Sequence, residues 1–143
     1  MNAHPDVGRV DIKDVVIRFD TKQGEVTALD RTKLMLEPGT FTALIGPSGC
    51  GKSTLMNAIA GFVSPSEGQL SLDGAQITGP SKDVGVIFQQ YALFPWFTAL
   101  GNVRFGLKQM GLSKSEEIDR ARAALDEVGL SAHADKYPQQ LSG

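Results

Sequence analysis

The sequence predicts an α/β fold with an antiparallel β layer at its N-terminus and a helical region at its C-terminus. Residues 10–19 and 26–36 are rich in apolar residues and are separated by a polar stretch, which is typical of two neighbouring strands. Residues 41–45 form a short apolar run that leads through a glycine-rich turn into apolar residues at helical spacing. From Thr98 onward the pattern is helical.

Composition limits the classes of protein to consider. The 143 residues are 41% hydrophobic and 21% charged, as expected for a globular domain with a core of its own. The net charge of −2 shows no excess of basic residues of the kind that binds nucleic acid, so we expect no nucleic-acid partner. Cys50 is the single cysteine, which excludes an internal disulfide. We expect neither a signal peptide nor a membrane-spanning segment, because no suitable apolar run is present.

Local signals place the remaining elements in order. Glu37-Pro38-Gly39 predicts a tight turn after the second strand. Residues 69–73 predict a short strand, and the apolar run at 84–88 is typical of a buried strand. Ser113 and Glu116 have the spacing of a capping box, so a helix is expected to begin there and to end before Gly129.

The stretch GPSGCGKST at residues 46–54 is the most informative motif. A glycine-rich loop between a strand and a helix lets backbone N–H groups surround phosphate oxygens, and the helix N-terminus adds attraction for anions. Lys52 would reach the phosphates and Ser53 would ligate Mg²⁺. A chance glycine turn is the alternative, which this context disfavours. The candidate phosphate-binding residues are Gly46, Pro47, Ser48, Gly49, Cys50, Gly51, Lys52, Ser53 and Thr54.

Two further segments join this loop in a more specific pattern. Gln89 follows the run at 84–88, at the edge of the sheet where ligands bind in α/β folds, although a plain strand end is equally compatible. The chain closes with Tyr-Pro-Gln-Gln-Leu-Ser-Gly at residues 137–143. In this order, the segments resemble the ATP-binding subunits of ABC transporters over residues 10–143, which implies an incomplete P-loop NTPase core that binds ATP and Mg²⁺.

The resemblance implies roles for individual residues. Lys52 and Gln89 would be catalytic, with Gln89 touching Mg²⁺ and the attacking water. Phe19 would stack on adenine, although it could instead be a core residue. Ser142 and Gly143 would begin the signature motif, which binds the γ-phosphate held by a second ATPase subunit in a head-to-tail dimer.

The apolar stretch Leu93-Phe94-Pro95-Trp96 indicates a partner site. The resemblance places it near the groove that receives a helix of the membrane permease subunit. We expect Pro95 and Trp96 to make this contact and Leu93 to pack in the core. The amino-acid sequences of these motifs are similar to those of the nitrate, sulfonate and taurine import branch. This implies an importer subunit that couples ATP hydrolysis to solute transport at the cytoplasmic face of the inner or plasma membrane.

Three features that the family carries after the signature motif have no match in this sequence: an Asp at a strand end, the catalytic Glu and a switch histidine. Asp126-Glu127 is expected to lie on a helix, and neither His4 nor His133 has the right position. We therefore expect one partial domain over residues 1–143, with the β layer and P-loop core at 1–97 and a helical subdomain at 98–143. We expect a truncated chain that binds ATP but does not hydrolyse it efficiently. The alternatives are a soluble ABC-type ATPase without a membrane partner and a nucleotide-binding module without catalysis.

Overall fold

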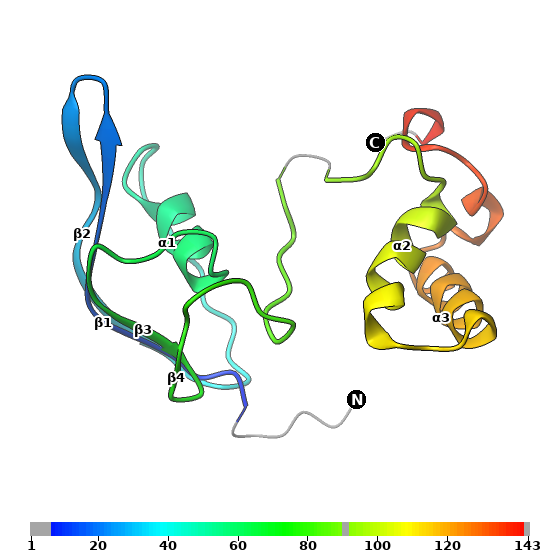
Figure 1. Ribbon diagram of the computed structural model, residues 1–143, viewed down its shortest axis with the longest axis horizontal. Coiled ribbons are helices and arrows are strands. Elements are labelled where there is room, and N and C mark those ends of the chain that lie inside the picture. Colours follow the sequence, from blue (N-terminus) through cyan, green and yellow to red (C-terminus); the bar gives the residue numbers. More distant parts are fainter. Residues whose placement is uncertain (1–6, 90–91, 142–143) are drawn as a thin grey trace. The chain divides into compact units, whose positions relative to one another are not determined.

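The computed structural model describes residues 7–89 and 92–141. The chain divides into two compact units, residues 1–87 and 88–143, and each is described by itself. Strands lie in the first unit and most of the helical residues lie in the second (Figure 1). The division at residue 97 that the sequence suggested stays a prediction.

A four-stranded sheet forms the frame of the first unit (Figure 1). Its strands are β1 (Val10–Thr21), β2 (Gly24–Leu36), β3 (Glu67–Leu72) and β4 (Ala75–Gln76), in the spatial order β2-β1-β3-β4. Each neighbouring pair is antiparallel, so the predicted antiparallel layer is confirmed. Because β1 is bonded on both sides, it contributes most of the fully buried side chains.

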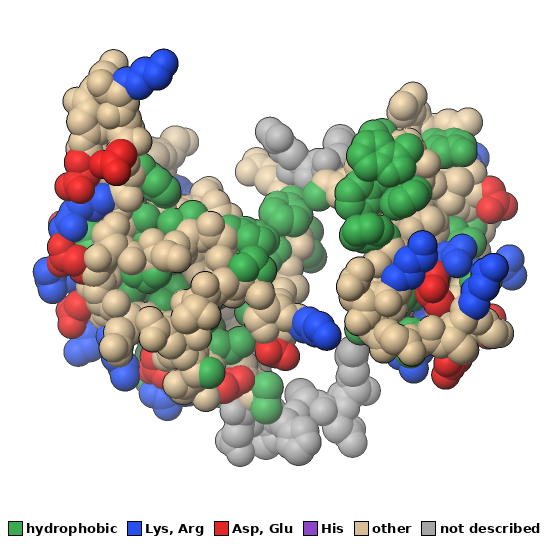
Figure 2. All heavy atoms as spheres, in the orientation of Figure 1, with side chains coloured by type: hydrophobic (Ala, Val, Ile, Leu, Met, Phe, Trp, Pro, Cys, Tyr) green, Lys and Arg blue, Asp and Glu red, His purple; other side chains and the backbone are tan. Residues whose placement is uncertain are grey.

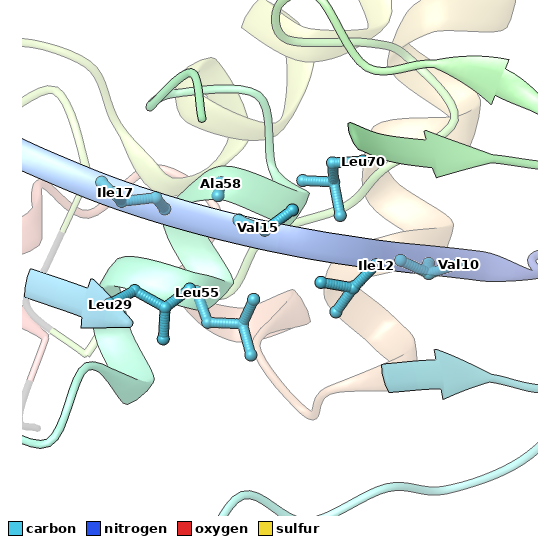
Figure 3. Close-up of a cluster of buried hydrophobic side chains, with 8 residues drawn as sticks. All are labelled: Val10, Ile12, Val15, Ile17, Leu29, Leu55, Ala58 and Leu70. Atoms are coloured by element: carbon cyan, nitrogen blue, oxygen red, sulfur yellow. The ribbon is translucent and has the colours of Figure 1, made fainter. Parts of the chain in front are cut away.

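Helix α1 (Lys52–Ile59) supplies the other side of the core. Leu55 and Ala58 of α1 are buried, whereas Met56 is 55% exposed. Residues 55 and 58, three positions apart, lie on the helix face that packs on the sheet. Residue 56 is turned by about 100° around the helix axis from residue 55 and points away from that face. Figure 3 shows the resulting cluster, which consists of Val10, Ile12, Val15, Ile17, Leu29, Leu55, Ala58 and Leu70.

Two predicted strands are wrong. Residues 41–45 and 84–88 have no strand assignment, and neither segment is a strand of the sheet in the part of the chain that the structure describes. Phe41, Ile45 and Ile87 are 95%, 93% and 97% exposed. A strand is held by ladder hydrogen bonds to a neighbour, so an apolar run without a partner strand stays extended and irregular.

Two helices that contact each other lie in the second unit. Helix α2 (Ala99–Leu107) is capped by Thr98, whose hydroxyl accepts from the N–H of Gly101 at 3.1 Å, and it continues into the short 3₁₀ segment η1 (Lys108–Met110). Arg104 of α2 donates to the carboxylate of Glu117 at 2.6 Å. Glu117 is the buried charged residue of this unit, so this ion pair satisfies a carboxylate that would otherwise be costly to bury.

Helix α3 (Lys114–Glu127) begins and ends as the sequence predicts. Ser113 and Glu116 form both bonds of a capping box, and these bonds lower the pKa of the Glu116 carboxyl. Gly129 follows the helix with a positive φ of 71°. Asp126-Glu127 therefore lies in the last turn of a helix, as expected.

Two short 3₁₀ segments complete the second unit, η2 (Ser131–His133) and η3 (Pro138–Gln140). Across residues 7–89 and 92–141, none of the helices combines the length and the apolar character that a membrane span needs.

Candidate nucleotide-binding site

The glycine-rich loop enters α1 through a backbone conformation that only glycine adopts readily. Gly51 is the N-cap of α1 and has a φ of 92°. A Cβ at this position would lie 2.7 Å from the carbonyl oxygen of Ala28, so the loop rests directly on the backbone of β2. Ala28 could not be predicted from the sequence, because this contact joins residues that are far apart along the chain.

The N-terminus of α1 has no side-chain cap. The first N–H groups of a helix have no acceptor within the helix, and they carry the positive end of the helix dipole. A phosphate oxygen is a suitable acceptor for such groups. Because Gly51 provides no side chain that could occupy this place, the helix start stays available to an anionic ligand.

The ammonium group of Lys52 bends back over the loop. Its Nζ donates to the carbonyl oxygens of Gly46 at 2.8 Å and of Pro47 at 2.6 Å, and it lies 3.5 Å from Sγ of Cys50. An ammonium has three donors and no acceptor, so it is suited to bind several oxygens at once. The positive charge is therefore held at the loop that leads into the uncapped start of α1. A phosphate bound there would be attracted by both the ammonium group and the helix N-terminus.

Ser53 and Thr54 occupy the first turn of α1, after Lys52. Ser53 is exposed, and its hydroxyl oxygen is the kind of hard ligand that Mg²⁺ prefers. A hollow of about 320 Å³ borders Lys52 and Ser53 and is otherwise lined mainly by apolar side chains of β2 and α1. The donor set thus fits a phosphate with its magnesium ion: an ammonium, free helix N–H groups and a hydroxyl.

The other predicted site residues lie in different parts of the chain. Phe19 lies near the end of β1, opposite Val26, and is 41% exposed, so it is outside the core. Gln89 is exposed and belongs to the second unit, whereas the phosphate loop belongs to the first. Ser142 and Gly143 lie outside the described residues. The structure therefore brings together the loop residues and Lys52 but does not relate Gln89 to them.

Four aromatic rings lie close together in the second unit, three on the segment that precedes α2 and one on α2 itself. Phe94, Trp96, Phe97 and Phe105 form an aromatic patch, with Phe94 in the middle at 5.5, 5.6 and 4.6 Å between its ring centre and those of the other three. Trp96 is 66% exposed, and Figure 2 shows hydrophobic side chains gathered over this loop. Leu93 is 46% exposed, so the prediction that it packs in the core is wrong. Phe94, its neighbour in the sequence, is the more buried of the two and is in contact with the other rings.

The fold and the loop define the class of protein. A glycine-rich turn that enters an uncapped helix beginning with Lys-Ser is the structure of a phosphate-binding loop, so this is a P-loop nucleotide-binding protein. The model of the family described as ABC transporter matches residues 29–143. The chain belongs to the ABC transporter family.

Individual relatives agree with this assignment. The chain is 45% identical over 134 residues to the nitrate import ATP-binding protein NrtD of Synechocystis sp., covering 94% of this chain and 50% of that protein. It is 41% identical over 137 residues to the taurine import ATP-binding protein TauB of Pseudomonas aeruginosa, covering 96% and 52%. The chain thus spans about half the length of the relatives it matches.

A solved structure confirms the fold. The chain is similar to a dimeric ATP-binding cassette in a post-hydrolysis state, bound to ADP and Pi, with a TM-score of 0.83 and 32% identity. The similarity covers 93% of this chain and 63% of that one. The predicted fold class, a P-loop NTPase of the α/β type, is therefore confirmed.

Proposed function

We propose that this chain provides the ATP-binding part of an importer subunit, which binds ATP with Mg²⁺ and couples it to solute transport. The observation that carries this proposal is the Lys52 ammonium held beside an uncapped helix start, within a chain of the ABC transporter family. Lys52 would bind the β- and γ-phosphates and Ser53 would ligate Mg²⁺. The remaining residues of the loop would surround the phosphates with their N–H groups.

The residues outside the loop take the roles that the family resemblance implies. Phe19 stacks on adenine, and its exposure at the end of β1 supports an accessible ring. Gln89 contacts Mg²⁺ and the attacking water. Ser142 and Gly143 bind the γ-phosphate held by a second ATPase subunit in a head-to-tail dimer. A dimeric ATP-binding cassette among the similar structures supports this arrangement.

The solute that we propose is nitrate or a sulfonate such as taurine. Support comes from two relatives whose names specify nitrate import and taurine import. The chain would work as a peripheral protein at the cytoplasmic face of the inner or plasma membrane, bound to a membrane permease subunit through Pro95 and Trp96.

We expect the 143-residue chain to turn ATP over slowly, at well below about 1 s⁻¹, the low end of typical enzymes. Hydrolysis needs a carboxylate or similar group to orient the attacking water, and the motif residues identified in this sequence include none. Phosphate release from pure protein at saturating ATP measures this. A rate near 1 s⁻¹ that disappears in the Lys52→Ala variant would contradict the expectation and would require a water-orienting group elsewhere in the chain.

Replacing Trp96 by Ala is expected to weaken assembly with the membrane subunit by tenfold or more, because a large exposed aromatic at an interface typically contributes about 2 kcal/mol. The measurement is co-purification in detergent with the membrane subunits of a nitrate importer and, separately, of a taurine importer. Met110→Ala is the matched control, since Met110 is a 65%-exposed apolar residue of the same unit outside the aromatic patch. Equal retention of both variants would contradict the contact that we assign to Trp96.

Two other functions are tested by the same experiments. A soluble ABC-type ATPase would bind ATP but would assemble with neither set of membrane subunits, whatever residue stands at 96. A nucleotide-binding module without catalysis would bind ATP, show no Lys52-dependent phosphate release and assemble with neither set of membrane subunits. The exposed aromatic patch favours the importer over the soluble ATPase, because large apolar patches at a protein surface mark partner sites.

A further inference from the structure

One polar side chain holds the whole loop that carries the aromatic patch. Asn102, on the second turn of α2, makes four hydrogen bonds, and all four reach back to residues 94–98. Its Oδ1 accepts from the N–H of Phe94 at 2.8 Å. Its Nδ2 faces the carbonyl oxygens of Phe94 at 3.2 Å, Phe97 at 3.2 Å and Thr98 at 3.0 Å.

The chemistry of these bonds requires an amide. The loop presents one N–H and three carbonyl oxygens to position 102, and an asparagine side chain offers one acceptor and two donors on a short stem. An aspartate of the same shape would place a negative charge against three carbonyl oxygens. An alanine would remove the side-chain partner of the N–H of Phe94 and of the carbonyl oxygen of Phe97, and leaving such partly buried groups unpaired costs more than the bonds themselves contribute. The carbonyl oxygens of Phe94 and Thr98 would keep their backbone bonds from the N–H groups of Phe97 and Asn102.

The conformation of residues 94–98 determines whether the aromatic rings form one patch. Phe94 and Phe97 are bonded to Asn102 through their backbones, and Trp96 lies between them in the sequence. The ring of Phe94 contacts those of Trp96, Phe97 and Phe105, so fixing its backbone fixes the centre of the patch. A surface that is ordered before binding does not have to be ordered by the partner, which strengthens binding.

We propose that Asn102 is a positioning residue for the membrane subunit: it holds residues 94–98 in the conformation that displays the aromatic patch. This inference rests on the partner contact in the proposed function. Asn102 does not touch the partner. It acts through the backbone of the loop, and its four bonds lie within the second unit, so we expect nucleotide binding by the loop at residues 46–54 to stay unchanged.

The experiment compares Asn102→Asp and Asn102→Ala with the control Gln109→Glu, which makes the same amide-to-carboxylate change at an exposed position of the same unit. Asn102→Ala keeps α2 folded, because alanine has the highest helix propensity, and circular dichroism verifies this. Trp96 is the single tryptophan of the sequence, so acrylamide quenching of its fluorescence reports on the loop alone. Assembly with the membrane subunits and ATP affinity are measured on the same proteins.

The expected result is that both Asn102 variants show about twofold stronger quenching and about tenfold weaker assembly, the size expected when a preorganised loop is released. ATP affinity is expected to stay within twofold, and Gln109→Glu is expected to match the wild type. Wild-type quenching in both Asn102 variants would overturn the inference. Wild-type assembly by both Asn102 variants would also overturn it, provided that the Trp96→Ala variant assembles poorly in the same assay. If Trp96→Ala itself assembles normally, the proposed contact fails first, and the positioning role fails with it.

Discussion

Replacing Lys52 by Ala is expected to weaken the binding of ATP with Mg²⁺ by about 30- to 150-fold, which corresponds to about 2–3 kcal/mol for charge-assisted hydrogen bonds to phosphate. In the structure, Nζ of Lys52 is already held beside the uncapped start of α1 by the carbonyl oxygens of Gly46 and Pro47. These two bonds and the contact with Sγ of Cys50 face all three donors of the ammonium, so a bound phosphate would replace some of these contacts. Isothermal titration of both proteins with ATP in the presence of Mg²⁺ measures the difference.

The control for this change is Lys108→Ala, which removes the same charge from an exposed position in η1 of the other unit. The affinity of the Lys108→Ala variant for ATP is expected to equal that of the wild type. If Lys52→Ala binds ATP within threefold of the wild type, then the ammonium does not contact the phosphates and the proposed role of the loop is wrong.

Replacing Ile12 by Ala is expected to lower the free energy of unfolding by about 2–5 kcal/mol, the usual cost of a cavity in a core. Ile12 is 1% exposed near the start of β1, between Leu34 on β2 and Leu70 on β3. Because the core of the first unit is small, its neighbours cannot readily close the space. Urea unfolding, followed by circular dichroism, measures the loss.

Ile87→Ala is the matched control, with the same atoms removed from a side chain that is 97% exposed. A surface change of this kind is expected to alter stability by less than about 0.5 kcal/mol. The pair also tests the correction made to the sequence-based prediction. If Ile87→Ala destabilises as much as Ile12→Ala, then residues 84–88 are buried after all, as their apolar composition suggested.

Elements whose signals are local could be predicted from the sequence. The turn at Pro38-Gly39, the glycine-rich loop before α1 and the capping box of Ser113 and Glu116 depend on residues within a few positions of one another. The two long strands are also visible in the sequence, because they are neighbours along the chain and pair with each other. The family resemblance rested on the same kind of signal, and the family match confirms it.

Elements that depend on a distant neighbour could not be predicted. The runs at 41–45 and 84–88 have the composition of buried strands, but composition does not say whether a partner strand is present. The contact between Gly51 and Ala28 joins residues that are far apart along the chain. The four bonds of Asn102 are local, since they reach only to residues 94–98, but they depend on the conformation of that loop, which no sequence motif marks. The sequence therefore indicated Trp96 as a partner residue and missed the residue that holds its loop.

The most direct test of the central claim is the equilibrium titration of the wild-type chain with ATP, with and without Mg²⁺, and in competition with adenosine. We predict saturable binding at one site that weakens when Mg²⁺ is removed, because Ser53 would lose its metal, and that adenosine displaces poorly, because it has no phosphate. Two results would contradict the account: no saturable binding at millimolar ATP, or adenosine that binds as tightly as ATP. The second would mean that residues 46–54 do not hold the phosphates.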